Sequence, residues 1–140
     1  MKHEQNKAIV RGYLNELVNK GNLSAFESYF SEDVVLNNSI KDVKQFIART
    51  RAINKVAFPD QQLTIEDQIA EGDKVVTRVS FQGTHQGEFN GIAPTGKQVK
   101  YSGMAMDRIA NGKVVEMWHM MNIQELLRQL GATPSPAPKK

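Results

Sequence analysis

The sequence predicts an α+β fold, in which N-terminal helices pack on one face of a curved antiparallel sheet. Two observations support this prediction. Before Pro59, apolar residues recur at the spacing of amphipathic helices, and after it they occupy alternate positions, as in half-buried strands. Helices first and strands afterwards is the order of an α+β domain, because a parallel α/β sheet would alternate the two.

Three helices are expected in the first part of the chain. The first covers residues 3–20, where pairs of apolar residues recur every four positions. A second, short helix lies in residues 22–30, and a brief strand follows in residues 34–38. The third helix begins near Ser39, because Ser39 and Asp42 have the spacing of a capping pair.

The second part of the chain predicts two β-hairpins. The first, residues 63–85, turns at Glu71-Gly72-Asp73. The second joins residues 97–109 to residues 112–122, and the segment between the hairpins has the glycines and proline of a loop.

A last helix begins at Asn122, which is spaced from Glu125 as in a capping box, and ends at Gly131. Residues 1–131 are therefore expected to form one domain. Residues 132–140 hold three of the five prolines and two terminal lysines, so we expect a disordered tail there.

The composition excludes several classes of protein. The formal charge is +3, but Lys139 and Lys140 supply two of these charges, so no basic surface for nucleic acid is predicted. The absence of cysteine excludes disulfides and thiolate metal sites. Neither a membrane-spanning apolar run nor a signal peptide is apparent, which predicts a cytoplasmic protein without a membrane partner.

The segment GKVVEMWHMMN, residues 112–122, sets a histidine in a strand that is apolar on both faces. Val115, Met117, His119 and Met121 share one face, and Trp118 lies on the other. Helices can cover only one of these faces, so a homodimer is expected to cover the second. His119 has two interpretations, a packed core residue or the acid–base group of a pocket.

The turn of the second hairpin decides what faces His119. A two-residue turn at Asn111-Gly112 would set His119 opposite Met104. A three-residue turn that includes Ala110 would set it opposite Gly103, beside Ala105. We favour the second register, because it places small residues next to the histidine and leaves room for a ligand.

Three segments together suggest a family. GTHQGEFNGIAPTGKQV, RIANGKVVEMW and LLRQLG resemble the SnoaL-like polyketide cyclase and ester cyclase family, which belongs to the nuclear transport factor 2-like superfamily. The resemblance implies a cone-shaped fold. In this fold a pocket lies between the first and third helices and the concave sheet, and dimers pair through the convex face.

The resemblance also implies site residues. His119 matches the position of the family's acid–base aspartate, Ala105 matches a second pocket histidine, and Asn122 stands where many relatives carry aspartate. His85 matches the family motif and is expected to order the following loop by hydrogen bonding. No cofactor or metal is expected. The expected substrate-binding residues are Tyr13, Tyr29, Arg49, Tyr101, Gly103, Ala105, Met117 and Met121.

The favoured function is that of a cofactor-independent cyclase or isomerase. Such an enzyme removes a proton next to a carbonyl in a small, largely apolar molecule, with His119 as the base and a tyrosine or Arg49 as donor to the enolate. One alternative is a non-catalytic protein that binds a small molecule in the same pocket. The second alternative is an epoxide hydrolase. Relatives on this fold open epoxides with an aspartate–arginine–aspartate set, and no such set is evident in this sequence.

Overall fold

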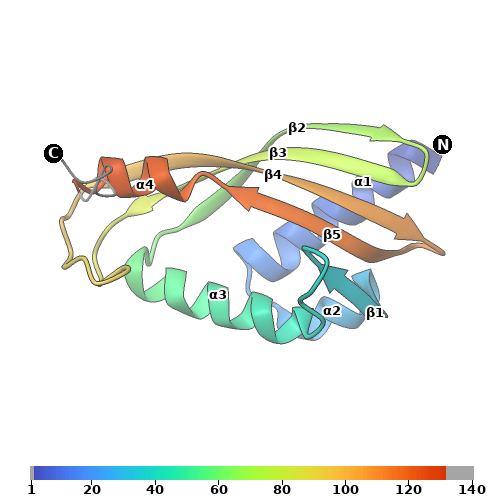
Figure 1. Ribbon diagram of the computed structural model, residues 1–140, viewed down its shortest axis with the longest axis horizontal. Helices are drawn as coiled ribbons and strands as arrows, with labels where there is room; N and C mark the ends of the chain where they lie inside the picture. Colours follow the sequence, from blue (N-terminus) through green and yellow to red (C-terminus); the bar gives the residue numbers. More distant parts are fainter. Residues whose placement is uncertain (1, 132–140) are drawn as a thin grey trace, which may run out of the picture.

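Five strands form one curved sheet in the order β1-β5-β4-β3-β2 (Figure 1). The computed structural model describes residues 2–131, so the predicted tail lies outside the described residues. Strands β2 to β5 form an antiparallel meander, as predicted, but β1 pairs with β5 in parallel. The sheet is therefore mixed, and a helix carries the chain from β1 at one edge to β2 at the other. The strands are β1 Phe30–Leu36, β2 Gln62–Glu71, β3 Lys74–Thr84, β4 Gln98–Ala110 and β5 Lys113–Met121.

The helices confirm the predicted order of elements, with two differences in detail. The first helix continues from its α-helical part into a π-helical segment, and the third begins at Val43 rather than near Ser39. Asp42 is the cap of this third helix, because its side chain accepts a hydrogen bond from the Gln45 amide at 3.3 Å. The helices are α1 Lys2–Tyr13, η1 Leu14–Asn19, η2 Leu23–Ala25, α2 Phe26–Tyr29, α3 Val43–Ala57 and α4 Ile123–Gln129. Within residues 2–131, none of them has the length and apolar character needed to cross a bilayer.

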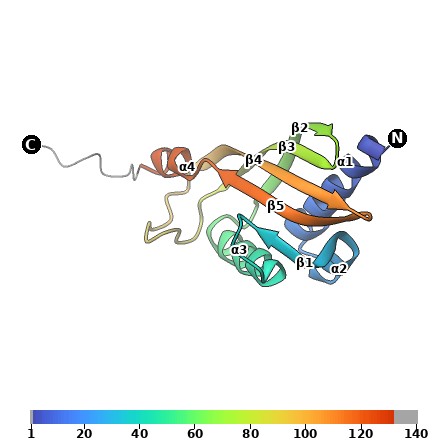
Figure 2. The same ribbon diagram turned by 45° about the vertical axis from the view of Figure 1, so that its right-hand side comes forward.

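The core consists of two clusters at opposite ends of the concave face. The larger joins α1, η1 and β1 to the sheet, and the smaller joins the end of α3, the 85–97 loop and α4 to β4. The turned view shows α1 and α4 at the two ends of the sheet, with α3 running beneath it (Figure 2). Phe81 and Met121 pack against both clusters and are only partly buried. The middle of the concave face is therefore less completely filled than its ends.

The predicted register of the last hairpin is wrong. Ala110 pairs with Lys113, so the connection is the two-residue turn Asn111-Gly112, with both residues in the left-handed region. The register then shifts between Arg108 and Ile109, because a bulge adds one residue to β5. Because of this bulge, His119 lies on the concave face, as we expected. The residue opposite His119 is Ala105, however, and Gly103 is opposite Met121.

The outer face of the sheet carries an apolar row across four strands. Ile69 pairs with Val76, Val76 with Met106, and Met106 with Trp118. In the adjacent row, Met104 and Met120 are 54% and 79% exposed. A contiguous apolar surface of this kind usually marks an interface between proteins.

We therefore expect a homodimer that pairs through this outer face. Analytical ultracentrifugation at about 10 µM should show dimers, because interfaces of useful affinity bury apolar rows of this sort. Met106→Lys should shift the protein to monomers, whereas Ile53→Lys, at an exposed apolar position of α3, should not. A monomeric native protein at this concentration would contradict the prediction.

Candidate functional site

A tyrosine, a carboxylate and a histidine from three elements meet on the concave face. The Tyr13 hydroxyl of α1 donates a hydrogen bond to Asp107 Oδ2 of β4 at 2.8 Å. His119 Nε2 of β5 lies 3.3 Å from Asp107 Oδ1 and 3.3 Å from the Tyr13 hydroxyl. Residues 94 and 12 positions away from Asp107 in the chain thus converge on its carboxylate.

Burial determines the state of this cluster. Asp107 is completely buried and Tyr13 nearly so, whereas the His119 side chain remains 28% exposed. Burial, followed by the charge of Asp107 and the hydrogen bond to it, raises the pKa of Tyr13 well above its ordinary value. Tyr13 therefore stays protonated and holds the carboxylate on one side, so that His119 alone of the three presents an edge outward.

The carboxylate also selects the tautomer of His119. When Asp107 is ionised its carboxylate only accepts hydrogen bonds, and Nε2, the ring nitrogen that faces it, is then the one that carries the proton. Nε2 is then the donor, and in the neutral ring Nδ1 has a free lone pair. This arrangement makes Nδ1 a proton acceptor with a fixed orientation.

The end of β1 explains why His119 is accessible. The parallel pairing of β1 with β5 ends at Leu36 and Met117, two residues before the histidine. Asn37, in the left-handed region at φ 51°, follows directly. Its amide donates to Met117 O at 2.8 Å, and its side-chain oxygen accepts from the His119 amide at 2.9 Å. Asn37 thus fixes the backbone of β5 where the sheet edge becomes free.

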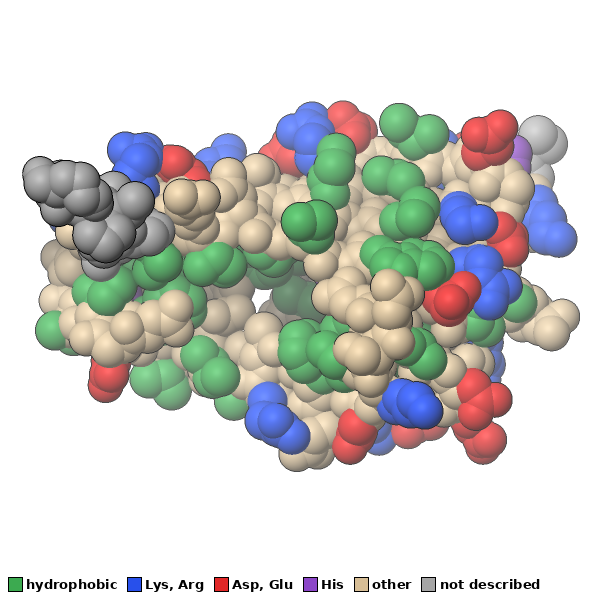
Figure 3. Space-filling view, viewed as in Figure 1, with side chains coloured by type: hydrophobic (Ala, Val, Ile, Leu, Met, Phe, Trp, Pro, Cys, Tyr) green, Lys and Arg blue, Asp and Glu red, His purple; other side chains and the backbone are tan. Residues whose placement is uncertain are grey.

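A hollow lies between α3 and the sheet. The space-filling view shows an opening there, with hydrophobic side chains on both sides of it (Figure 3). Phe81 and Tyr101 are paired on the concave face, and their stacked rings have centroids 5.6 Å apart. Burial raises the pKa of Tyr101 to about 12. Its hydroxyl therefore stays protonated at neutral pH, and the residue belongs to the smaller core cluster.

The buried Tyr101 hydroxyl should make the protein sensitive to alkali. A tyrosine whose pKa is raised from 10.0 to about 12 contributes stability below pH 10 that is lost as the pH rises toward 12. Urea unfolding at pH 9 and pH 11.5 should show that the native protein loses about 2 kcal/mol more than Tyr101→Phe. Equal losses in the two proteins would contradict this assignment.

Some predicted site residues are not open to a ligand. Met117 is paired with Asp107 across the hairpin, but it is 1% exposed and belongs to the larger core cluster. The Tyr29 ring packs against α1, where an added Cβ on Gly12 would lie 2.7 Å from it. Arg49 is exposed on α3, and the arginine that reaches inward is Arg51, which donates to Val18 O and Asn19 O at the end of η1.

Gly103 and Ala105 do lie on the same face as the cluster, as predicted. Ala105 is directly opposite His119 and buried. The space over Gly103, however, is not open, because the Met121 side chain fills it. His85 has the role predicted for it: its Nδ1 accepts a hydrogen bond from the Thr95 amide at 3.1 Å and so ties down the 85–97 loop.

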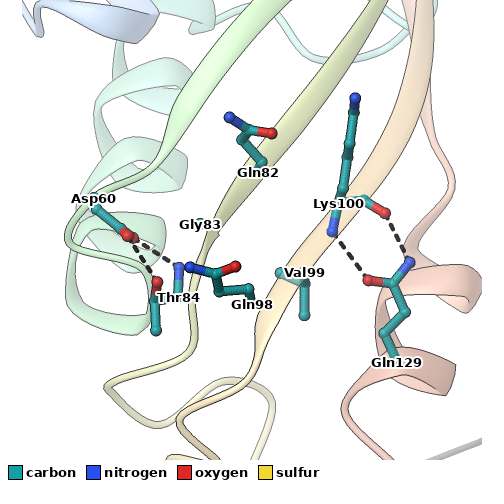
Figure 4. A pocket seen from close by; sticks show the side chains of 8 residues that line it. All are labelled: Asp60, Gln82, Gly83, Thr84, Gln98, Val99, Lys100 and Gln129. Atoms are coloured by element: carbon teal, nitrogen blue, oxygen red, sulfur yellow. Dashed lines mark hydrogen bonds between the residues drawn. The ribbon is translucent and has the colours of Figure 1, made fainter.

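Two further hollows lie elsewhere on the surface. A polar one of about 440 Å³ lies between the turn at Asp60 and α4, with Thr84 and Gln129 hydrogen-bonded at its margins (Figure 4). An apolar one of about 430 Å³ includes Met104 and Met120 of the outer face, and Gly103 and Met121 also line it. Neither is lined by Tyr13, Asp107 or His119. In the part of the chain that the structure describes, no three His, Asp or Glu side chains are grouped as metal ligands.

The sequence prediction missed Asp107. A signal was present, because Asp107 shares the alternating pattern of the segment GMAMDRI with Gly103 and Ala105, on the face assigned to the pocket. A carboxylate on a buried face is rare unless it is paired. The structure shows that both of its partners were already among the candidates.

The cone-shaped α+β fold is that of the nuclear transport factor 2-like proteins. The sequence profile of the SnoaL-like polyketide cyclase family matches residues 8–130, and the chain belongs to this family. No functionally curated protein matches the sequence significantly.

Solved structures agree with this placement. AclR, a proposed hydroxylase from Streptomyces galilaeus, is 32% identical with a TM-score of 0.80, over 98% of this chain and 87% of that one. IdmH, a proposed polyketide cyclase from Streptomyces antibioticus, is 27% identical with a TM-score of 0.77, over 91% and 99% of the two chains. A proposed polyketide cyclase from Acidithiobacillus ferrooxidans, at 24% identity and a TM-score of 0.78 over 93% and 96%, shares the fold.

Proposed function

We propose that this protein is a cofactor-independent cyclase or isomerase, in which His119 removes a proton next to a carbonyl. The observation that carries the proposal is the contact of His119 Nε2 with the buried Asp107 carboxylate at 3.3 Å. A carboxylate that orients a histidine and stabilises its protonated form is a recurring arrangement for general bases. Membership of the SnoaL-like polyketide cyclase family supports cyclase-type chemistry.

The proposed step balances without an external oxidant or reductant. Nδ1 of His119 takes the proton from the carbon next to the carbonyl, and the C–H electron pair moves into an enolate. In an isomerase the same histidine returns the proton to another carbon. In a cyclase the enolate carbon attacks a second carbonyl of the same molecule, and the resulting alkoxide takes up the proton. The charge that develops on the imidazolium is stabilised by Asp107.

Tyr13 is a positioning residue in this proposal. Its hydroxyl donates to Asp107 at 2.8 Å, so it is not free to bind the enolate oxygen while this bond persists. Tyr101 lies four residues along β4 from Ala105, about 13 Å away at the rise of a strand. Its neutral hydroxyl suits a second polar group at the distant end of an extended substrate, and an apolar wall such as Phe81 suits fused rings.

Hydrogen–deuterium exchange of 2-tetralone, a bicyclic ketone with acidic C–H groups, tests the proposal. The native protein in D₂O should accelerate loss of the proton next to the carbonyl over buffer, as followed by NMR. Asp107→Asn should weaken the acceleration, because an amide does not enforce the Nε2–H tautomer. Binding of 2-tetralone without any acceleration would contradict catalysis and favour the non-catalytic binding protein instead.

A further inference from the structure

Met121 lies over the position of β4 where the concave face carries no side chain. Met121 and Gly103 are paired across the hairpin. An added Cβ on Gly103 would lie 2.1 Å from Met121 Sδ and 2.6 Å from Cε. The methionine side chain therefore rests directly on the backbone of β4, in space that a side chain at position 103 would otherwise occupy.

This position separates the acid–base cluster from the rest of the concave face. The pair Gly103–Met121 adjoins the pair Ala105–His119. On the other side, Tyr101 is the next inward-facing residue of β4. Met121 is also partly buried and packs against both core clusters. Its side chain thus lies between His119 and the stacked rings of Phe81 and Tyr101.

Only the side chain of Met121 is free to change position. The next amide, that of Asn122, donates to Ser102 O at 2.9 Å and holds the end of β5 on β4. The Asn122 side chain also caps α4, accepting from the Glu125 amide at 3.1 Å. Methionine is unbranched and has three rotatable side-chain bonds, so its thioether can take up more than one position.

We propose that Met121 is the specificity-determining residue of the site. In the observed position it closes the space over Gly103, which suits ligands of one ring near His119. Rotation of the side chain joins that space to the region of Phe81 and Tyr101, which suits flat, fused-ring carbonyl compounds. This inference rests on the proposed function, because it places the ligand against His119.

Two carbonyl compounds of different size test the inference by their dissociation constants. Alizarin has three fused rings and acetophenone has one. Met121→Ala should bind alizarin at least about tenfold more tightly than the native protein, with a change of less than about threefold for acetophenone. Met121→Leu is the matched control and should keep the native preference, because its side chain has nearly the same volume.

The position of the native side chain is tested separately. In protein labelled at the methionine methyl groups, the resonance assigned to Met121 by its loss in Met121→Leu should move when alizarin is added. Equal changes for the two compounds in Met121→Ala, no change for either, or no binding of either would overturn the inference. If Met121→Ala does not fold, Met121→Val decides in the same way. If the native protein does not accelerate proton exchange, the proposed function is wrong. The inference about Met121 is tested separately, because the ratio of dissociation constants does not depend on catalysis.

Discussion

Replacing His119 by glutamine is expected to reduce the exchange rate of 2-tetralone about 10²- to 10⁴-fold, the usual contribution of a general base. Glutamine keeps a donor that can reach Asp107 Oδ1, where His119 Nε2 now lies at 3.3 Å, but it has no basic nitrogen. The side chain is partly exposed, so the free energy of unfolding should change by less than about 1 kcal/mol. Loss of activity in a folded protein would thus report on chemistry.

His3→Gln is the matched control for this variant. His3 is an exposed residue of α1, so its replacement should leave both the exchange rate and the stability unchanged. An exchange rate in His119→Gln equal to that of the native protein would show that another group is the base. Comparing the exchange rates of the two variants separates catalysis by the site from catalysis by a surface histidine.

Replacing Asp107 by alanine should destabilise the protein by about 3 kcal/mol. The change leaves the Tyr13 hydroxyl and the His119 Nε2–H without their shared acceptor, and an unpaired buried polar group costs about 1–3 kcal/mol. Because Tyr13 and Asp107 are buried, water cannot readily replace the lost partner. Urea unfolding would measure this loss of stability, provided that the dependence of the unfolding free energy on urea concentration is the same in both proteins.

A double-mutant cycle with Tyr13→Phe distinguishes lost hydrogen bonds from lost volume. Phenylalanine removes the donor that Asp107→Ala leaves unpaired, so the double variant should lose less stability than the two single variants together. The expected difference is about 1–2 kcal/mol, in the range found for residues in one network. Additive losses, or an Asp107→Ala variant as stable as the native protein, would mean that the cluster does not act as a unit.

The fold was predictable because, within most of its helices and strands, the apolar residues recur at the spacing typical of that element. Val75, Thr77 and Val79 alternate with outward residues along β3 and lie where the period places them. The register of the last hairpin was not predictable, because Asn111-Gly112 gives the usual two-residue turn and the shift arises later, at a bulge in β5. No residue type near the bulge marks it in the sequence.

The site was predictable only in part. His119 was found because a lone histidine interrupts an apolar strand face, and Tyr13 was one of several residues named as possible donors to the enolate. Asp107 was missed because its carboxylate, within DRI, reads as part of an ordinary charged pair with Arg108. The choice of Arg49 overlooked the helical period, because Arg51 lies four residues after Ile47, on the apolar side of the helix, and so reaches η1.

The tautomer of the His119 ring tests the central claim most directly. Nitrogen-15 NMR of the native protein at a pH where the ring is neutral reports which nitrogen carries the proton. Contact with Asp107 predicts that Nε2 carries the proton and Nδ1 is unprotonated, with the Nε2–H resonance lost in His119→Gln. A neutral ring protonated at Nδ1 would contradict the claim that Asp107 prepares Nδ1 of His119 as the base.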